Sequence, residues 1–349
     1  MKVTGQINPW IKQLKAYEPG KQVKGSIRLM SSENNYGPSP GVEEALKRCE
    51  IGRYCDPNYT LLKQKISEYC DVKPDKVTVT AGSDEAFDLA SKIFLTRGCN
   101  VLAQYPTFPM YKIFATTYGA RYLGIPAEAD FSFNAEKFLK SVGGKHLIYL
   151  CNPVNPAGAK IQKEDIKAIV ESAECPVIVD EAYYEFCGET AVDLTEEYDN
   201  LIVARTFSKA FGLAGARLGY VVANPEIISY YERVKSPWNV SSPAAFAGVA
   251  AMFDIPFMKK NVDKIINDRR LLEEFLSNYF KVYSSSANFV FFDVSGKLTS
   301  LEFFEKMKKH NIIVRRIGKL EGFEGDYIRT SVGKTEECTL FMEAVKAII

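Results

Sequence analysis

The sequence is poor in histidine, and its cysteines are not spaced for metal binding. It has two histidines, His146 and His310, and neither stands at metal-ligand spacing from a cysteine or from the other histidine. This argues against zinc sites and against catalysis by a histidine-based triad. The eight cysteines include no C-x-x-C pair, and no signal-peptide pattern precedes them, so we expect reduced thiols in a cytoplasmic protein.

Long apolar runs and an excess of one charge are also absent. No apolar run reaches the roughly 18 residues that a membrane-spanning helix requires, and the formal net charge is +1. We therefore expect no membrane partner and no nucleic-acid partner. The 349 residues, of which 46% are hydrophobic, suit about two globular domains. The chemistry must then come from lysine, aspartate, tyrosine or a cofactor.

Short apolar segments alternate with helix-like segments from Val77 to about Val222. Candidate strands cover residues 76–80, 100–105, 146–150, 176–180, 200–204 and 217–222. Several are apolar throughout, as expected for strands that are covered by helices on both faces. The segments between them include helix-like patterns at 84–94 and 163–173. This alternation predicts an α/β fold with a doubly wound, mostly parallel sheet, in which ligands bind beyond the carboxyl ends of the strands.

A second, smaller α/β region begins near Ser236. It contains a long helical pattern, a second helix-like segment and three candidate strands, at residues 255–280, 301–310, 288–294, 311–316 and 327–332. The first ~30 residues carry several prolines and glycines and predict an arm with little core of its own. We therefore predict an N-terminal arm (1–30) that packs with the small domain, a large ligand-binding domain (31–235) and a small domain (236–349).

An aspartate and a lysine follow two of the predicted strands. The segment PVIVDEAYYEF places Asp180 at the end of one strand, and NLIVARTFSKAFG places Lys209 just past another. Asp180 could simply cap a turn, or it could hold a carboxylate against a cationic ring nitrogen. Lys209 could lie in solvent like most lysines, but its neighbours are small and apolar. That setting favours an amine whose pKa is lowered by desolvation, as attack on a carbonyl requires.

Several groups suited to a phosphate lie close to this lysine or to another strand end. Thr206 and Ser208 flank the lysine, and Arg217 follows eight residues after it. Residues 82–85 lie between a strand and a helix, where backbone N–H groups bind phosphate, although an ordinary helix cap fits them equally well. Asn155 lies in a run of Asn-Pro turns, which alone is a weak signal.

The order of four motifs closely resembles the aspartate-aminotransferase-like, fold type I enzymes that use pyridoxal 5′-phosphate. The motifs are Gly-Ser-Asp-Glu, Asn-Pro-x-Asn-Pro-x-Gly, Asp-Glu-Ala-Tyr and Ser-Lys-x-x-Gly-x-x-x-x-Arg. The resemblance covers essentially the whole chain and places it in class II. Within that group, three stretches resemble histidinol-phosphate aminotransferases, at residues 14–21, 31–42, and 207–228 joined to 235–242.

The resemblance implies a cofactor role for each matching position. Lys209 would carry pyridoxal 5′-phosphate as a Schiff base, and Asp180 would face the pyridine nitrogen. Tyr183 and Asn155 would bind the phenolic oxygen of the ring, and Phe108 would stack on it. The phosphate would be held by the backbone of Ser83 and Asp84 and by the side chains of Thr206, Ser208 and Arg217.

The resemblance also implies substrate contacts and a homodimer. Tyr17, Asn155 and Arg329 match substrate-binding positions, with Arg329 as the main anion anchor. Arg315 matches a second anion-binding arginine, and Arg316 competes for that role because the spacing is ambiguous by one residue. Tyr54 matches a tyrosine that reaches the phosphate of the neighbouring subunit. The implied reaction is transamination between histidinol phosphate and 2-oxoglutarate in histidine biosynthesis.

The sequence departs from the family pattern at three positions, none of which is Lys209 or Asp180. Ala157 replaces a threonine, Ser32 an asparagine and Cys55 a proline. An aminotransferase for aromatic or other amino acids and a phosphothreonine decarboxylase of the same fold are therefore alternatives. A non-catalytic, cofactor-sensing regulator would carry an added DNA-binding module, for which the arm is too short and not basic. A nicotinamide dehydrogenase would need G-x-G-x-x-G after the first strand, where the sequence has none.

Overall fold

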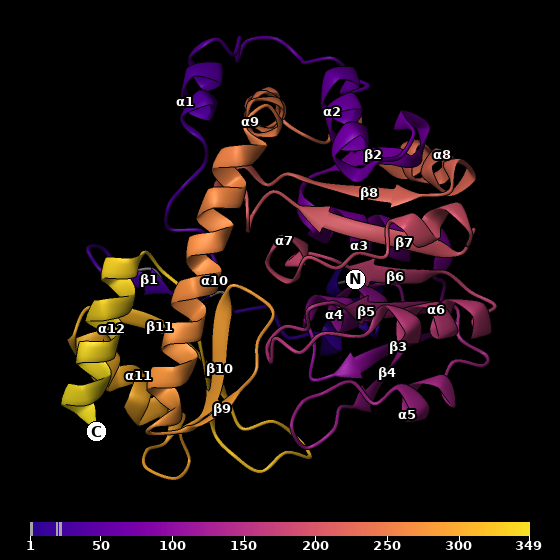
Figure 1. Cartoon of the computed structure of the whole chain (residues 1–349). Helices are drawn as coiled ribbons and strands as arrows, with labels where there is room; N and C mark the ends of the chain where they lie inside the picture. Colours follow the sequence, from indigo (N-terminus) through magenta and orange to yellow (C-terminus); the bar gives the residue numbers. More distant parts are fainter. Residues whose placement is uncertain (1–2, 19, 21–22) are drawn as a thin grey trace.

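The computed structural model describes residues 3–18, 20 and 23–349 and contains two β-sheets with helices packed around them (Figure 1). The other five residues, 1, 2, 19, 21 and 22, belong to the predicted arm, and two of them fall in the motif at 14–21. Predictions made for those positions lie outside the described residues.

The larger sheet has seven strands in the order β2-β8-β7-β6-β5-β3-β4. Only β8 runs antiparallel to its neighbours, so the predicted mostly parallel α/β sheet is confirmed. The strands are β2 (Val77–Thr80), β3 (Asn100–Tyr105), β4 (Arg121–Pro126), β5 (Leu147–Cys151), β6 (Val177–Asp180), β7 (Leu201–Thr206) and β8 (Gly219–Ala223).

Helices cover both faces of this sheet, which explains why its central strands are apolar throughout. Side chains alternate along a strand, so neighbouring residues of β6 enter different cores. Val177 and Val179 join one buried cluster, and Ile178 joins the other. The helices that follow these strands are α3 (Gly82–Phe94), α4 (Met110–Thr117), α5 (Ala135–Leu139), α6 (Lys163–Ser172), α7 (Tyr184–Cys187) and α8 (Pro225–Val234).

The smaller sheet has five strands in the order β1-β11-β12-β10-β9. Its strands are β1 (Ile27–Leu29), β9 (Lys281–Tyr283), β10 (Phe289–Asp293), β11 (Ile312–Gly318) and β12 (Tyr327–Ser331). Helices α10 (Ile255–Ser277), α11 (Ser300–Lys309) and α12 (Thr335–Ile348) pack against it. β1 lies within the predicted arm and pairs in parallel with β11, and its Leu29 is fully buried.

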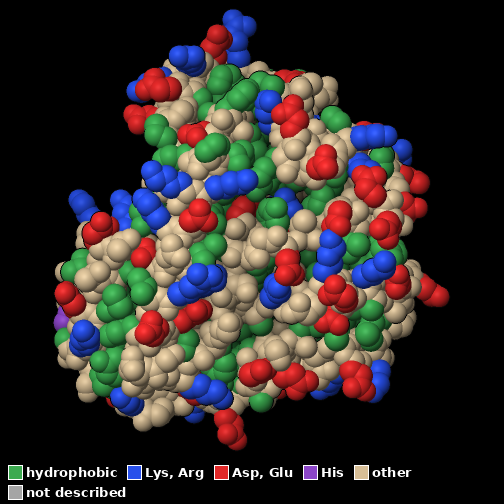
Figure 2. All heavy atoms as spheres, in the orientation of Figure 1, with side chains coloured by type: hydrophobic (Ala, Val, Ile, Leu, Met, Phe, Trp, Pro, Cys, Tyr) green, Lys and Arg blue, Asp and Glu red, His purple; other side chains and the backbone are tan. Residues whose placement is uncertain are grey.

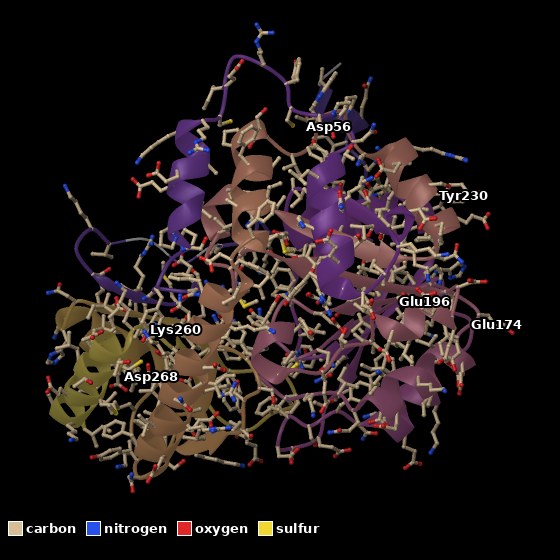
Figure 3. The ribbon with its side chains drawn as sticks, turned by 45° about the horizontal axis from the view of Figure 1, so that its top comes forward. Asp56, Glu174, Glu196, Tyr230, Lys260 and Asp268 are labelled. Carbon is tan, nitrogen blue, oxygen red and sulfur yellow. The ribbon has the colours of Figure 1, made fainter. Side chains whose placement is uncertain are left out.

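Three helices gather at one end of the molecule, at the top of Figure 1: α1 (Pro40–Lys47), α2 (Thr60–Cys70) and α9 (Ser242–Met252). Asp56 lies just before α2 (Figure 3) and accepts hydrogen bonds from the backbone N–H groups of Asn58 (3.0 Å) and Thr60 (2.7 Å). The Thr60 side chain and these two N–H groups lower the pKa of Asp56. Hydrophobic side chains are gathered on the surface of this end (Figure 2). They include Leu61, Phe246 and Phe253, which line a shallow apolar groove.

Five short 3-10 helices complete the described secondary structure: η1 (Val3–Gln6), η2 (Ile11–Gln13), η3 (Pro74–Lys76), η4 (Asp193–Glu196) and η5 (Ala214–Ala216). In the part of the chain that the structure describes, no helix is both long and apolar enough to cross a membrane.

A buried ion pair connects the carboxyl ends of β6 and β7. Glu181, directly after β6, and Arg205, in β7, approach to 2.8 Å, and both are almost completely buried. Glu181 also accepts hydrogen bonds from Thr190 and from the backbone of Ala191, while the Arg205 guanidinium lies 3.7 Å from the ring centroid of Tyr184. Separating the pair would leave two buried charges without partners, which is costly. The pair therefore fixes the two strand ends relative to each other. Asp180 and Thr206 are the adjacent residues, so the pair also positions the site.

Candidate active site

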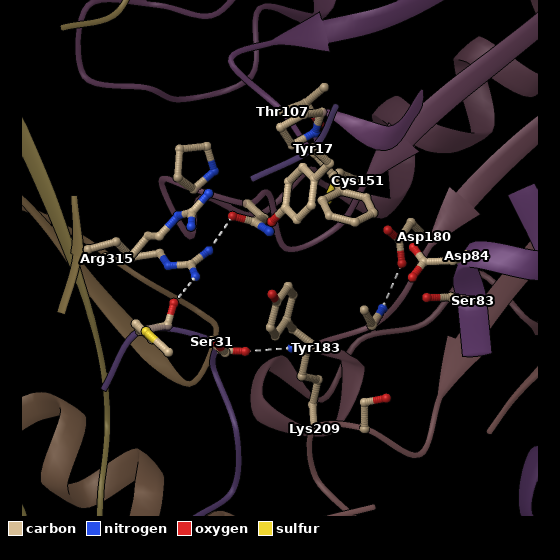
Figure 4. Close-up of a pocket in the computed structure, with 18 of the residues that line it drawn as sticks. Tyr17, Ser31, Ser83, Asp84, Thr107, Cys151, Asp180, Tyr183, Lys209 and Arg315 are labelled. Atoms are coloured by element: carbon tan, nitrogen blue, oxygen red, sulfur yellow. Dashed lines mark hydrogen bonds between the residues drawn. The ribbon is translucent and has the colours of Figure 1, made fainter. Parts of the chain in front are cut away.

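A cavity of about 630 Å³ lies between the carboxyl ends of the large-sheet strands and strands β11 and β12 of the small sheet (Figure 4). It brings together every residue predicted from the sequence for the site, apart from Tyr54. These lining residues are Tyr17, Ser83, Asp84, Phe108, Asn155, Asp180, Tyr183, Thr206, Ser208, Lys209, Arg217, Arg315 and Arg329. Arg316, the competitor of Arg315, also lines it.

Lys209 lies in the loop after β7 and points into this cavity. Its Nζ donates a hydrogen bond to the backbone carbonyl of Ser31 at 2.9 Å. Burial, followed by the positive charges of Arg329 and Arg217, lowers the pKa of the amine to about 8, against the opposing charges of Glu33 and Asp84. About one tenth of the amine is therefore uncharged at pH 7, the form that a nucleophile or a proton acceptor must take.

Asp180 ends β6 and is also buried. One carboxylate oxygen accepts the backbone N–H of Ala182 at 3.0 Å, and the other accepts the hydroxyl of Tyr111 at 2.5 Å. Burial raises the pKa of Asp180 to about 6, and these two hydrogen bonds oppose the rise. Among the described residues no cation forms an ion pair with Asp180, whereas the adjacent Glu181 is neutralised by Arg205. The site thus holds a buried carboxylate whose cationic partner would be a ligand.

A second part of the cavity is suited to an anion such as a phosphate. Ser83 and Asp84 lie in the first turn of α3, where backbone N–H groups are free to donate. The guanidinium of Arg217 contacts both Asp84 Oδ2 (3.1 Å) and Ser208 Oγ (3.3 Å), and Thr206 Oγ1 donates to Ser208 Oγ (3.0 Å). Gly82 has a φ of +76°, a backbone conformation that glycine adopts readily and residues with a side chain rarely do.

A third part of the cavity carries two arginines from adjacent strands of the small sheet. Arg315 in β11 pairs directly with Arg329 in β12. Arg329 is buried; its guanidinium donates to Asn155 Oδ1 and, at 2.9 Å, to the backbone carbonyl of Met30. Its Nε has no hydrogen-bond partner in the part of the chain that the structure describes. Figure 4 shows Arg315 on the side of the cavity opposite Ser83 and Asp84.

The side chains of the two competing arginines are held differently. Arg315 donates to the backbone carbonyl of Glu18 at 3.3 Å and lies over the ring of Tyr17. Arg316 Nε donates instead to Ser300 Oγ of α11 at 3.1 Å. Successive residues of a strand point to opposite faces, so only one of them can share a face with Arg329. The strand register gives that place to Arg315.

Tyr54 is the predicted site residue that the structure does not bring to the cavity. Its side chain stacks on Trp238 with ring centroids 4.3 Å apart, and it is 77% exposed. A single chain therefore leaves this tyrosine in solvent, next to the helical end formed by α1, α2 and α9.

Sequence reasoning missed other residues at the site. Tyr111, which is not among the described residues that line the cavity, donates a hydrogen bond to Asp180. Cys151, at the end of β5, lines the cavity. The backbone carbonyls of Met30 and Ser31 hold Arg329 and Lys209. The spacing of Phe108 and Tyr111, about one helical turn, was a signal available in the sequence. No sequence signal indicated the contacts to the carbonyl groups of Met30 and Ser31, because every residue has a backbone carbonyl group.

Comparison with known proteins identifies the family. The chain matches the family of class I and II aminotransferases over residues 24–345, and it belongs to that family. It is 34% identical, over the full length of both chains, to a histidinol-phosphate aminotransferase from Methanococcus aeolicus. It is 36% identical over 312 residues, 88% of each chain, to a histidinol-phosphate aminotransferase from Caldanaerobacter subterraneus.

A solved structure gives the same result for the fold. The crystal structure of histidinol-phosphate aminotransferase from Sinorhizobium meliloti in complex with pyridoxal 5′-phosphate superposes with a TM-score of 0.89. The sequences are 25% identical, and the match covers 99% of this chain and 97% of the other. The predicted fold class and the predicted enzyme class, an aminotransferase, are thus confirmed.

The residues present fit a pyridoxal 5′-phosphate cofactor, as the family membership implies. The cavity offers a depressed-pKa amine for its aldehyde, an unpaired buried carboxylate for its ring nitrogen, and a helix start with Arg217 for its phosphate. Among the described residues, no group of three or more histidine, cysteine or acidic side chains is arranged to hold a metal ion.

Proposed function

We propose that this aminotransferase transfers the amino group of histidinol phosphate to 2-oxoglutarate, in histidine biosynthesis, with pyridoxal 5′-phosphate bound to Lys209. The observation that carries the proposal is the presence of two separate cationic groups in the cavity that holds Lys209. Arg217 would serve the cofactor phosphate, which leaves Arg329 and Arg315 for an anionic group of the substrate. The similarity to two histidinol-phosphate aminotransferases supports that choice of substrate.

The proposed chemistry divides between the cofactor and the side chains around it. When bound, the cofactor would supply the electron sink for the pair left at the substrate's Cα. Asp180, as an anion, would hold a proton on the pyridine nitrogen. Tyr183, Asn155 and Phe108 line the cavity; the first two would bind the phenolic oxygen of the ring, and Phe108 would stack on it.

Lys209 is the proton carrier of this scheme. With pyridoxal phosphate bound and the donor's amino group held in place of its own, the Lys209 amine would accept the Cα proton and donate it again. Its pKa of about 8 lies close to neutral pH, where a group can both accept and donate a proton efficiently. The same lysine then acts in reverse with 2-oxoglutarate, so the kinetics are of the ping-pong type.

Arg329 would bind the anionic group in both half-reactions. Histidinol phosphate offers a phosphate and no carboxylate, whereas glutamate and 2-oxoglutarate offer a distal carboxylate. A guanidinium can bind either anion by donating a pair of hydrogen bonds to it. Arg315, on the same face, and Tyr17 would complete this anion site. Among the described residues the buried Nε of Arg329 has no hydrogen-bond partner, which supports this role.

The proposal includes a cytoplasmic homodimer in which Tyr54 completes the partner's phosphate site. Tyr54 lies in solvent, away from the cavity of its own chain, beside an apolar groove lined by Leu61, Phe246 and Phe253. Apolar surface of this kind favours a protein interface. The eight unpaired cysteines favour a reducing compartment. The division into an arm (1–30), a cofactor-binding domain (31–235) and a small domain (236–349) belongs to the same proposal.

A panel of amino donors tests the substrate. With 2-oxoglutarate as acceptor, histidinol phosphate should give a kcat/KM at least about a hundredfold above that of phenylalanine, because only the former presents a phosphate to two arginines. Steady-state kinetics measure both values. A higher kcat/KM with phenylalanine would favour an aromatic aminotransferase, and release of CO₂ from phosphothreonine would favour a decarboxylase.

Replacement of the arginines tests the shared anion site. Arg329→Ala should raise KM by about tenfold or more for both histidinol phosphate and 2-oxoglutarate, because a charge-assisted, paired hydrogen bond is lost in each half-reaction. Arg316→Ala is the matched control and should change either KM by less than about threefold, since its Nε is engaged by Ser300. Unchanged KM values for Arg329→Ala would refute the role of this residue.

Mixing two inactive variants tests whether Tyr54 acts across subunits. Tyr54→Ala and Lys209→Ala chains are each expected to be nearly inactive as homodimers. If Tyr54 serves the partner's site, each hybrid dimer contains one intact site, and random exchange should restore about one quarter of the wild-type activity. If Tyr54 serves its own chain, no hybrid has an intact site and mixing restores nothing.

A further inference from the structure

Tyr111 is held against Asp180 by an aromatic cluster behind the cavity. It is fully buried in α4, with its ring stacked on Tyr149 at 4.6 Å and 4°. Phe87 and Phe108 meet it edge to face, at 5.2 Å and 5.6 Å. Contacts on several sides leave the ring little freedom to rotate. Its hydroxyl therefore points at Asp180 Oδ2 as a fixed feature of the fold.

The Tyr111 hydroxyl can act toward Asp180 only as a donor. Burial and the neighbouring carboxylate raise the pKa of Tyr111 well above its ordinary value, so its proton stays in place. A carboxylate accepts that proton in a hydrogen bond, whereas a neutral carboxyl group would have to direct its own proton elsewhere. The contact thus favours the ionised form of Asp180 and fixes the plane of its carboxylate.

Among the described groups around Asp180, the N–H of Ala182 provides the other such support, by donating to Oδ1 at 3.0 Å. Asp84 disfavours ionisation, Lys209 favours it weakly, and Cys151 is a neutral neighbour whose pKa is raised by burial. Burial is the largest influence and raises the pKa of Asp180 to about 6. Loss of one of two hydrogen bonds would bring ionisation of this buried group into the neutral pH range.

We propose that Tyr111 is a positioning residue that keeps Asp180 ionised and oriented toward the pyridine nitrogen of the cofactor. This inference rests on the proposed function, because it gives Asp180 that partner. Tyr111 does not line the cavity formed by the described residues, so it acts through Asp180 and not by touching the ring. A hydrogen bond to a charged group is of the strong kind. Its loss should appear as a shift in the ionisation of Asp180 and in cofactor retention.

A neighbouring tyrosine provides a matched control. Tyr149 is equally buried and stacks on the same ring, but its hydroxyl contacts Ser91 and the carbonyl of Phe87. Tyr111→Phe and Tyr149→Phe each remove one buried oxygen from the same aromatic stack. Only the first removes a hydrogen bond to Asp180, so a purely structural role predicts similar effects for the two variants.

The experiment compares both variants with and without cofactor. In the ligand-free protein, difference infrared spectroscopy of the carboxyl groups should place the pKa of Asp180 about one to two units higher in Tyr111→Phe. With ¹⁵N-labelled pyridoxal 5′-phosphate, nuclear magnetic resonance should detect a less protonated ring nitrogen. The cofactor dissociation constant and kcat should each worsen by about tenfold, with the donor KM within about twofold. Tyr149→Phe should match the wild type in every one of these measurements.

A second variant guards against an effect on folding alone. In an Asp180→Asn background, Tyr111→Phe should change cofactor affinity by less than about twofold, because the charge that it supports is gone. Equal pKa values of Asp180 and equal ring protonation in Tyr111→Phe and wild type would overturn the proposal. A full additional tenfold loss in the Asp180→Asn background would overturn it as well. If wild-type protein bound no pyridoxal 5′-phosphate while the Asp180 pKa still shifted, the proposed function would fail, and the cofactor role of Tyr111 with it.

Discussion

A carboxylate buried without a cation, at the end of β6, is the constraint around which this site is built. The two successive acids differ in their partners. Glu181 is neutralised by Arg205 of the same chain, whereas Asp180 accepts two hydrogen bonds and has no counterion among the described residues. A buried charge is costly unless it is paired or hydrogen-bonded. The fold therefore retains an anion whose best partner is a cation supplied by a ligand, and a protonated pyridine ring meets that requirement.

The segment between β1 and α1 connects this carboxylate site to the small sheet. The carbonyl groups of Met30 and Ser31 accept hydrogen bonds from Arg329 and Lys209, the two side chains that the proposed reaction must free for ligands. Ser32 follows with a φ of +53°, in the left-handed region. Asparagine tolerates that region better than most residues, so the backbone at this position suits the asparagine that the family resemblance leads one to expect there. Ser32 is held there by Ser331 and Asn288 of the small sheet.

Much of the fold could be predicted because the central strands are covered on both faces. The apolar runs in residues 177–180 and 201–204 are uninterrupted and lead into a polar residue. The sequence therefore indicated both the strands and the edge of the sheet at which a ligand binds. Strand β4 was missed because it is an edge strand whose residues are largely exposed. Strand β1 was missed because three residues are too short to establish a period, and its pairing with β11 spans almost the whole chain.

Cavity residues that lie close together in one sequence motif could be predicted. Lys209, Ser208 and Arg217 lie within ten residues of one another, so their spacing is itself informative. The pairs Tyr111–Asp180 and Glu181–Arg205 join segments that only the folded sheet brings together. Tyr54 is a different case, since it is exposed in the single chain and its proposed role depends on a second copy.

The central claim is that the amine of Lys209 is the one that binds the cofactor covalently, beside the carboxylate of Asp180. Borohydride reduction of the protein with pyridoxal 5′-phosphate makes that bond permanent, and peptide mapping by mass spectrometry then locates it. We predict about one pyridoxyl group per chain, on the peptide that contains Lys209. A label on another lysine, or none on the Lys209 peptide, would contradict the account.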